Sequence, residues 1–110
     1  MRNDQSLGEF EGLVLSVIPV LHDKAYGVSV LESLEVKTSK KYNISAIHIC
    51  LKRLEEKGFV KSHFGGITSG RGGRRKKLYI ITAFGKRVLD EQYELSADRY
   101  QQVPKIAFTR

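Results

Sequence analysis

Apolar residues recur every three or four positions along the first half of the chain, which is the spacing of amphipathic helices. A first helix is expected over residues 7–21, where the apolar stripe consists of Leu7, Phe10, Val14, Val17, Ile18 and Leu21. Further apolar residues widen this stripe almost round the helix, so the helix should pack against more than one partner. Proline has no backbone N–H, and Pro19 is therefore expected to kink the last turn or to end it early.

Two further helices are predicted, with a short polar turn between them. The second should cover residues 24–38, with Asp23 as its N-cap. The third should cover residues 44–57, with Asn43 as its N-cap and Gly58 closing it. Helical phase places polar side chains on the outward face of the third helix, namely Ser45, His48 and Lys52.

The spacing of apolar residues changes after the third helix. Residues 59–64 and 77–82 are rich in β-branched and aromatic side chains, which predicts two paired strands. Residues 65–76 between them contain five glycines and are expected to form a long hairpin loop. Thr82 should cap a last helix that runs to about residue 102, before Pro104.

This order of elements predicts a mainly α fold with a small β-hairpin, in the form of a winged helix-turn-helix followed by a long C-terminal helix. We expect a DNA-binding domain over residues 1–82 with a wing at about 59–82, a dimerisation helix over 83–103 and a tail over 104–110. The first and last helices carry more apolar positions than one monomer can bury, which predicts a two-fold homodimer. Its candidate contacts are Phe10, Val14, Phe84, Val88 and Leu95.

The positive charge of the chain is concentrated in its middle. Fourteen of the nineteen basic residues lie between Lys37 and Arg87, together with only two acidic residues, so this segment has a formal charge of +12, whereas the whole chain has +7. The segments before and after it carry −4 and −1. A merely soluble surface would scatter its lysines, whereas a segregated basic block is typical of proteins that bind a polyanion.

The predicted fold supplies two elements that would contact double-stranded DNA. The third helix of such a fold enters the major groove, where Ser45, His48 and Lys52 would face the bases. Asn43 would cap this helix and could also reach a phosphate. The wing would contact phosphates through its clustered basic residues, which are Arg71, Arg74, Arg75 and Lys76.

The sequence argues against several other classes of protein. It contains no paired carboxylates, no nucleophile beside a base and no phosphate-binding loop, so no enzymatic activity and no cofactor are expected. Zinc-ligand spacing is absent around its histidines and its one cysteine, so no metal site is predicted. The single Cys50 fits a reducing compartment, and no apolar run is long enough to span a membrane; the expected location is the cytoplasm.

Five short segments, taken in order, resemble the PadR-like family of winged-helix transcriptional regulators. The segments are Leu7–Glu11, Ala25–Gly27, Leu51–Val60, Arg71–Tyr79 and Thr82–Gly85. The resemblance covers nearly the whole chain and implies a homodimeric bacterial repressor whose last helix packs against the first helix of the partner. It also implies a phosphate contact for Tyr26 and, as in some members, a small-molecule inducer. His48 stands where the family usually has a tyrosine, so the contacts of that tyrosine do not carry over directly.

The preferred interpretation is therefore a dimeric repressor that binds a pseudo-palindromic operator. A flat aromatic inducer would find Tyr93 and Tyr100 near the dimer interface, because the chain has no tryptophan. Sequence alone leaves two alternatives open. One is a winged-helix module that binds a protein and only weakly binds nucleic acid, and the other is a winged helix that binds RNA.

Overall fold

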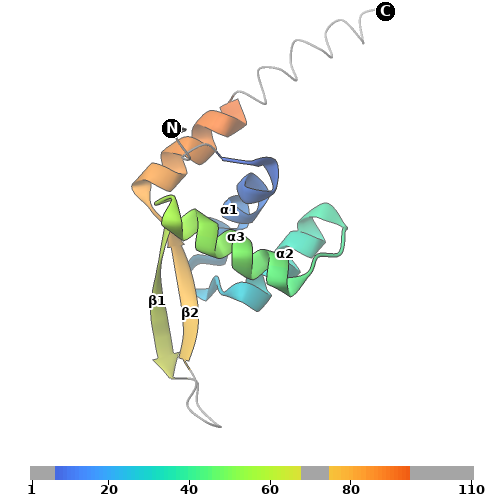
Figure 1. The fold of residues 1–110 in the computed structure, drawn as a ribbon. Helices are drawn as coiled ribbons and strands as arrows, with labels where there is room; N and C mark the ends of the chain where they lie inside the picture. The colour runs from blue at the N-terminus through green and yellow to red at the C-terminus, as the bar shows by residue number, and fades with distance from the viewer. Residues whose placement is uncertain (1–6, 68–74, 95–110) are drawn as a thin grey trace, which may run out of the picture.

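A computed structural model describes residues 7–67 and 75–94 of the chain (Figure 1). Three helices come first: α1 (Glu9–Leu21), α2 (Gly27–Thr38) and α3 (Ile44–Glu56), with the short 3-10 helix η1 (His22–Lys24) between α1 and α2. The antiparallel strands β1 (Val60–Ile67) and β2 (Arg75–Ile81) follow. A last helix occupies residues 83–94, and residues 95–103 of the predicted dimerisation helix lie outside the described residues. The predicted mainly helical fold with a small two-stranded sheet is confirmed.

The ends of α3 form for the reasons that the sequence suggests. The side chain of Asn43 accepts a hydrogen bond from the backbone N–H of Ser45 at 2.7 Å, which satisfies one of the free donors at the helix start. Gly58 follows the helix with a φ of +84°, a conformation that glycine adopts without steric cost. The backbone N–H of Phe59 then donates to the carbonyl of Leu54 at 2.9 Å and closes the last turn.

The first helices depart from expectation at two places. Pro19 does not end α1 early, since the helix continues to Leu21. Asp23 does not cap α2, because it lies in η1 and α2 begins only at Gly27. The backbone N–H of Tyr26 is instead satisfied by the hydroxyl of Ser29 at 2.9 Å, which fixes the start of α2 three residues later than expected.

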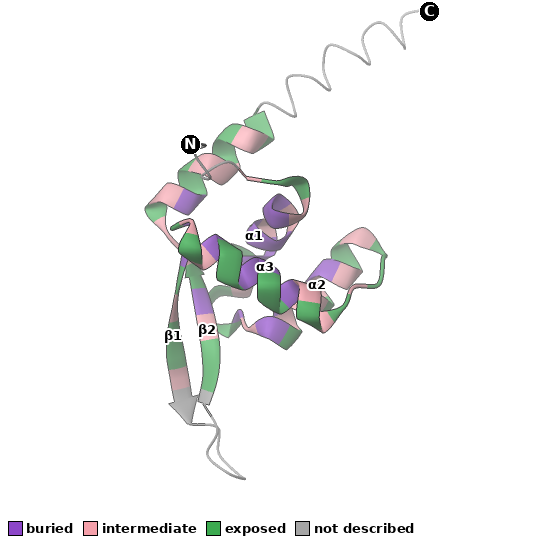
Figure 2. Ribbon diagram, in the orientation of Figure 1, coloured by how far each residue is buried: buried purple, intermediate pink, exposed green. Residues whose placement is uncertain are grey.

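The core lies where the three helices meet the base of the sheet, as the buried positions in Figure 2 show. It is formed by aliphatic side chains from each helix together with Phe59, Val60 and Tyr79. Val14 is fully buried in this core. Its proposed place in a dimer interface is therefore wrong, because the single chain already covers it.

The strands β1 and β2 form the described part of the wing, and they project away from the helices (Figure 1). Val60 pairs with Ile81 and Ser62 with Tyr79, and the register shifts between Phe64 and Ile67. The backbone N–H of Tyr79 donates to the carbonyl of Ala25 at 2.8 Å, so β2 is hydrogen-bonded to the segment just before α2. The wing is thus joined to the helix-turn-helix at its base.

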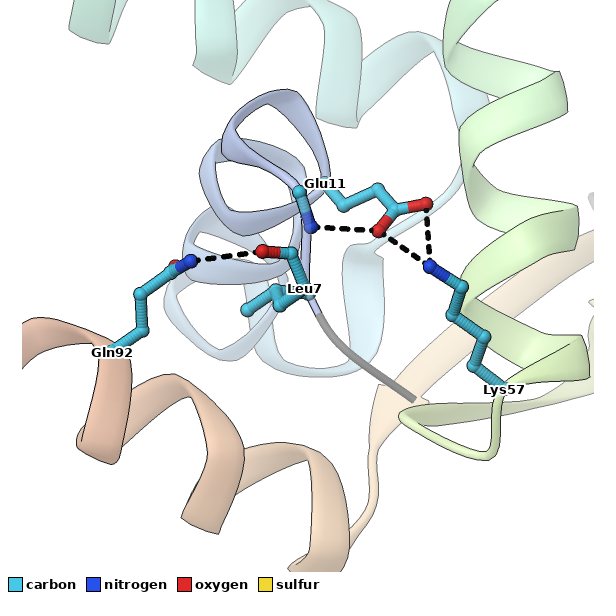
Figure 3. Close-up of polar contacts among 5 residues, drawn as sticks. Leu7, Glu11, Lys57 and Gln92 are labelled. Carbon is cyan, nitrogen blue, oxygen red and sulfur yellow. Dashed lines mark hydrogen bonds and ion pairs between the residues drawn. The ribbon is translucent and has the colours of Figure 1, made fainter. Parts of the chain in front are cut away.

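The last helix returns across α1. Thr82 caps it as expected, because its hydroxyl accepts a hydrogen bond from the N–H of Gly85 at 2.9 Å. Gly85 packs so closely on Phe59 that a Cβ at this position would overlap the carbonyl oxygen of Phe59. At its far end Gln92 donates to the carbonyl of Leu7 at 3.0 Å (Figure 3). None of the helices in the described ranges is long and apolar enough to cross a bilayer.

Candidate nucleic-acid interface

The outer face of α3 carries most of the residues that the sequence predicts as base contacts. Asn43, Ser45, His48 and Lys52 are all exposed, while the opposite face of α3 is buried. Ile49 lies on the same outer face and is 59% exposed, which is unusual for a large aliphatic side chain. The sequence-based prediction missed Ile49 because it counted only polar residues as candidates.

His48 lies at the edge of this face rather than at its centre. A Cβ built on Gly27 would lie 2.5 Å from Cε1 of the His48 ring, so the ring rests directly on the first residue of α2. His48 is still a neighbour of Ser45 and Lys52 on the outer face, because it lies three residues after Ser45 and four before Lys52. A side chain at position 27 would displace the imidazole.

Two of the predicted contacts come together beside α2. The Nζ atom of Lys76, on β2, lies 4.1 Å from the centroid of the Tyr26 ring, which directly precedes α2. A cation–π contact of this kind contributes about 0.5–1 kcal/mol at an exposed site. It holds the lysine of the wing close to the start of the helix-turn-helix, and it leaves Tyr26 half-buried.

The wing contributes further positive charge. Arg75 is the first residue of β2, and Arg71 and Arg74 lie outside the described residues. Exposed basic residues that the site prediction left out also lie on the α2–α3 turn, α3 and the two strands: Lys40, Lys41, Arg53, Lys61 and Lys77. The +12 segment thus places most of its described cations on the elements that contact DNA in a winged helix.

An ion pair joins the start of α1 to the end of α3 (Figure 3). Nζ of Lys57 lies 2.9 Å from Oε1 of Glu11, and the same oxygen accepts a hydrogen bond from the N–H of Gly8 at 3.0 Å. Burial on its own raises the pKa of Glu11, but the Gly8 and Lys57 contacts outweigh it and hold the pKa below its usual value. This pair fixes the C-terminal end of α3 relative to α1.

Cys50 lies on the inner side of α3 and is buried. Burial raises the pKa of its thiol to about 12, so the reactive thiolate is disfavoured. Within residues 7–67 and 75–94, no three His, Cys, Asp or Glu side chains are grouped so that they could hold a metal ion.

Two open grooves flank α1. One, of about 570 Å³, lies between the start of α1 and α3 and is lined by Phe10, Ile49, Cys50, Arg53 and Lys57 among others. The other, of about 520 Å³, lies between α1 and α2 and includes Val20 and Val36. Tyr93 is 74% exposed and lines neither groove, and Tyr100 lies outside the described residues.

The predicted dimer contacts are placed differently from one another. Phe10 is half-buried, with its ring 5.6 Å from that of Tyr42. Phe84 is also half-buried, and its ring centroid lies 5.2 Å from that of Phe59. Val88 follows about one turn later on the same helix and is half-buried as well. Leu95 lies outside the described residues. Phe10, Phe84 and Val88 therefore keep part of their surface free.

The fold and the exposed basic helix and wing define a winged helix-turn-helix of the kind that binds DNA. Residues 14–91 of the 110 match the Transcriptional regulator PadR-like family, and the chain belongs to this family of DNA-binding transcriptional regulators. The family resemblance of the sequence is thereby confirmed.

Solved structures of similar proteins agree with this assignment. A PadR-family transcriptional regulator from Eggerthella lenta DSM 2243 is 25% identical, with a TM-score of 0.69 over 93% of this chain and 88% of that one. A PadR-like transcriptional regulator from Bacillus cereus strain ATCC 14579 is 19% identical, with a TM-score of 0.75 over 92% and 93% of the two chains. The latter likeness concerns the fold alone. No curated protein sequence matches the chain.

Proposed function

We propose that the protein is a homodimeric repressor that binds a pseudo-palindromic operator in double-stranded DNA. The observation that carries the proposal is the exposed basic surface of α3 and the wing, within a segment of net charge +12. Binding over a promoter would exclude RNA polymerase sterically. The setting for this activity is the cytoplasm of a bacterium.

In this proposal the residues of α3 read the bases and the residues around it fix the register. Ser45 and Lys52 face the base edges, and Ile49 adds an apolar surface of the kind that contacts a thymine methyl group. His48 contacts the edge of the site from its position on Gly27. Phosphate contacts come from Tyr26, Asn43, Lys76 and the wing arginines Arg71, Arg74 and Arg75.

The dimer is proposed from the apolar surface that α1 and the last helix keep exposed. Phe10, Phe84 and Val88 are its described candidate contacts, with Leu95 beyond them in the sequence. A two-fold axis between these helices would set the two copies of α3 about 34 Å apart, the repeat of the DNA major groove.

The proposal extends to a small-molecule inducer. A flat, apolar ligand near the dimer interface would stack on Tyr93 or Tyr100. It would release DNA only by preferring a dimer geometry in which the two α3 helices no longer match successive grooves. If no such ligand exists, occupancy of the operator depends on the abundance of the protein alone.

One observation favours the rival function of a protein-binding module. Val20 and Val36 are 73% and 82% exposed and lie on the rim of the groove between α1 and α2. Exposed aliphatic pairs of this kind are common at protein interfaces. The rival requires that the basic surface of α3 and the wing binds nucleic acid only weakly.

The test is a selection of duplexes from a random DNA pool. A repressor of this kind enriches an inverted repeat whose half-sites are centred one helical turn apart. A protein-binding module enriches no sequence. Competition with duplex RNA tests the RNA-binding alternative, because duplex RNA would displace an RNA-binding winged helix from the enriched DNA site.

A further inference from the structure

Glu55, near the end of α3, touches both strands of the wing. Its Oε2 atom accepts a hydrogen bond from the hydroxyl of Ser62 on β1 at 2.7 Å. Its Oε1 atom lies 3.7 Å from Nζ of Lys77 on β2. One carboxylate of α3 therefore holds the two strands together from the side of the helix.

The register of the hairpin makes this contact possible. Ser62 pairs with Tyr79 and Phe64 pairs with Lys77, and paired residues point to the same face of a sheet. Ser62 and Lys77 thus share the face on which Tyr79 is buried against the helices. Glu55 therefore meets the face of the wing that carries Ser62, Lys77 and Tyr79, because side chains alternate between the two faces of a strand.

The apolar contacts of the wing end close to its base. Val60 and Tyr79 are 2% and 6% exposed, but Phe64, further out on the same face, is 61% exposed. Polar contacts to this part of the wing come from Glu55 of α3, while Nζ of Lys76 lies over the ring of Tyr26, which directly precedes α2. An isolated two-stranded hairpin is only marginally stable, so its direction depends on such contacts.

We propose that Glu55 is a positioning residue that sets the direction of the wing relative to α3, so that both reach the same DNA duplex. The inference rests on the proposed DNA-binding function. It runs against the simple electrostatic expectation, in which a carboxylate beside a polyanion weakens binding and its removal strengthens it. Whether removal of the Glu55 carboxylate weakens or strengthens DNA binding therefore distinguishes a positioning role from a purely electrostatic one.

Glu56 provides a matched control. It is the next residue on α3, carries the same charge and is exposed, and no hydrogen bond or ion pair joins its side chain to another residue of the described ranges. Ser62→Ala provides the complementary variant, because it removes a partner of Glu55 and leaves every charge in place. Circular dichroism melting first establishes that each variant is folded.

The experiment measures wing direction and DNA affinity separately. Spin labels are attached at His63→Cys on the exposed side of β1 and at Val36→Cys on α2, which is 82% exposed; the buried Cys50 is protected from labelling. Pulsed electron resonance gives the distribution of distances between the labels without DNA. Affinity for duplex DNA is measured on the unlabelled variants, with the duplex enriched by selection.

The expected result is a broader distance distribution for Glu55→Ala and Ser62→Ala, and a Kd for DNA raised about three- to tenfold, because the wing must then be ordered on binding. Glu56→Ala should keep the narrow distribution and lower the Kd by about twofold. A narrow distribution in Glu55→Ala, or a Kd that falls as in Glu56→Ala, overturns the proposal. If the unchanged protein binds no duplex, the proposed function fails, whereas the spin-label distances still test the contact itself.

Discussion

Replacing Gly85 by alanine should uncouple the last helix from the base of the wing. A Cβ at this position would overlap the carbonyl oxygen of Phe59, and backbone atoms cannot move aside as a side chain can. The same carbonyl accepts hydrogen bonds from the N–H and the hydroxyl of Thr82 at 2.9 and 3.1 Å. Relief of the overlap therefore displaces the cap of the helix as well as its packing on Phe59.

The size of the effect follows from three terms. Overpacking of this kind costs about 1–3 kcal/mol. Weakening two hydrogen bonds adds about 0.5–1.5 kcal/mol each. Alanine returns up to about 1 kcal/mol of helix propensity. We therefore expect Gly85→Ala to lower the free energy of unfolding by about 3 kcal/mol, which corresponds to a fall in Tm of about 12 °C or more.

Thermal and urea unfolding at one fixed protein concentration measure this difference. Gly8→Ala is the matched control, because the nearest atom to a Cβ there is Oε1 of Glu11 at an ordinary 3.5 Å. The control should change the stability by no more than about 1 kcal/mol, because Gly8 is the N-cap of α1 and alanine is a poorer N-cap residue. A Gly85→Ala protein as stable as the control would refute the close docking of the last helix on Phe59.

Three further outcomes are expected. Arg75→Ala should weaken binding to specific and scrambled duplexes alike, whereas Lys52→Ala should change which operator bases are preferred. Competition binding on both duplexes measures this. A change of base preference in the Arg75 variant instead would reverse the roles proposed for the wing and α3. Glu11→Gln should cost about 2 kcal/mol at neutral pH. The pKa of Glu11 is lowered in the folded protein, so this cost should persist above the ordinary carboxyl pKa and vanish as the pH falls through the pKa of the folded state. Unfolding curves of the two proteins that stay equally far apart at every pH would contradict this. Cys50 should resist a thiol reagent at pH 8 until the chain is unfolded by urea, and immediate modification of the native protein would show that the thiol is accessible.

Local patterns predict the elements of this fold well. The periodicity of α3, its Asn43 cap and Gly58 after it are set by neighbouring residues, and all three are confirmed. The start of α2 was misplaced because a 3-10 turn and the Ser29 hydroxyl, rather than Asp23, satisfy the backbone there. An N-cap candidate can be proposed from its residue type, but whether that residue caps the helix depends on the path of the preceding chain.

Contacts between distant residues could not be predicted from the pattern. Glu11 and Lys57 are 46 positions apart, and nothing in either helix alone indicates that they meet. The same is true of His48 on Gly27 and of Lys76 on Tyr26, which depend on how α3 and β2 pack against α2. Val14 was assigned to the dimer for a related reason, since an apolar stripe does not reveal whether it faces the monomer core or a partner.

The dependence of DNA affinity on salt tests the central claim most directly. If the two basic surfaces of a dimer neutralise roughly six to ten phosphates, log affinity should fall against log salt concentration with a slope of about −5 to −9. The measurement is an equilibrium titration of the selected duplex at several salt concentrations, with a scrambled duplex beside it. The account predicts this steep slope for both duplexes and tighter binding to the selected one. An affinity that hardly changes between low and moderate salt would contradict DNA binding by α3 and the wing.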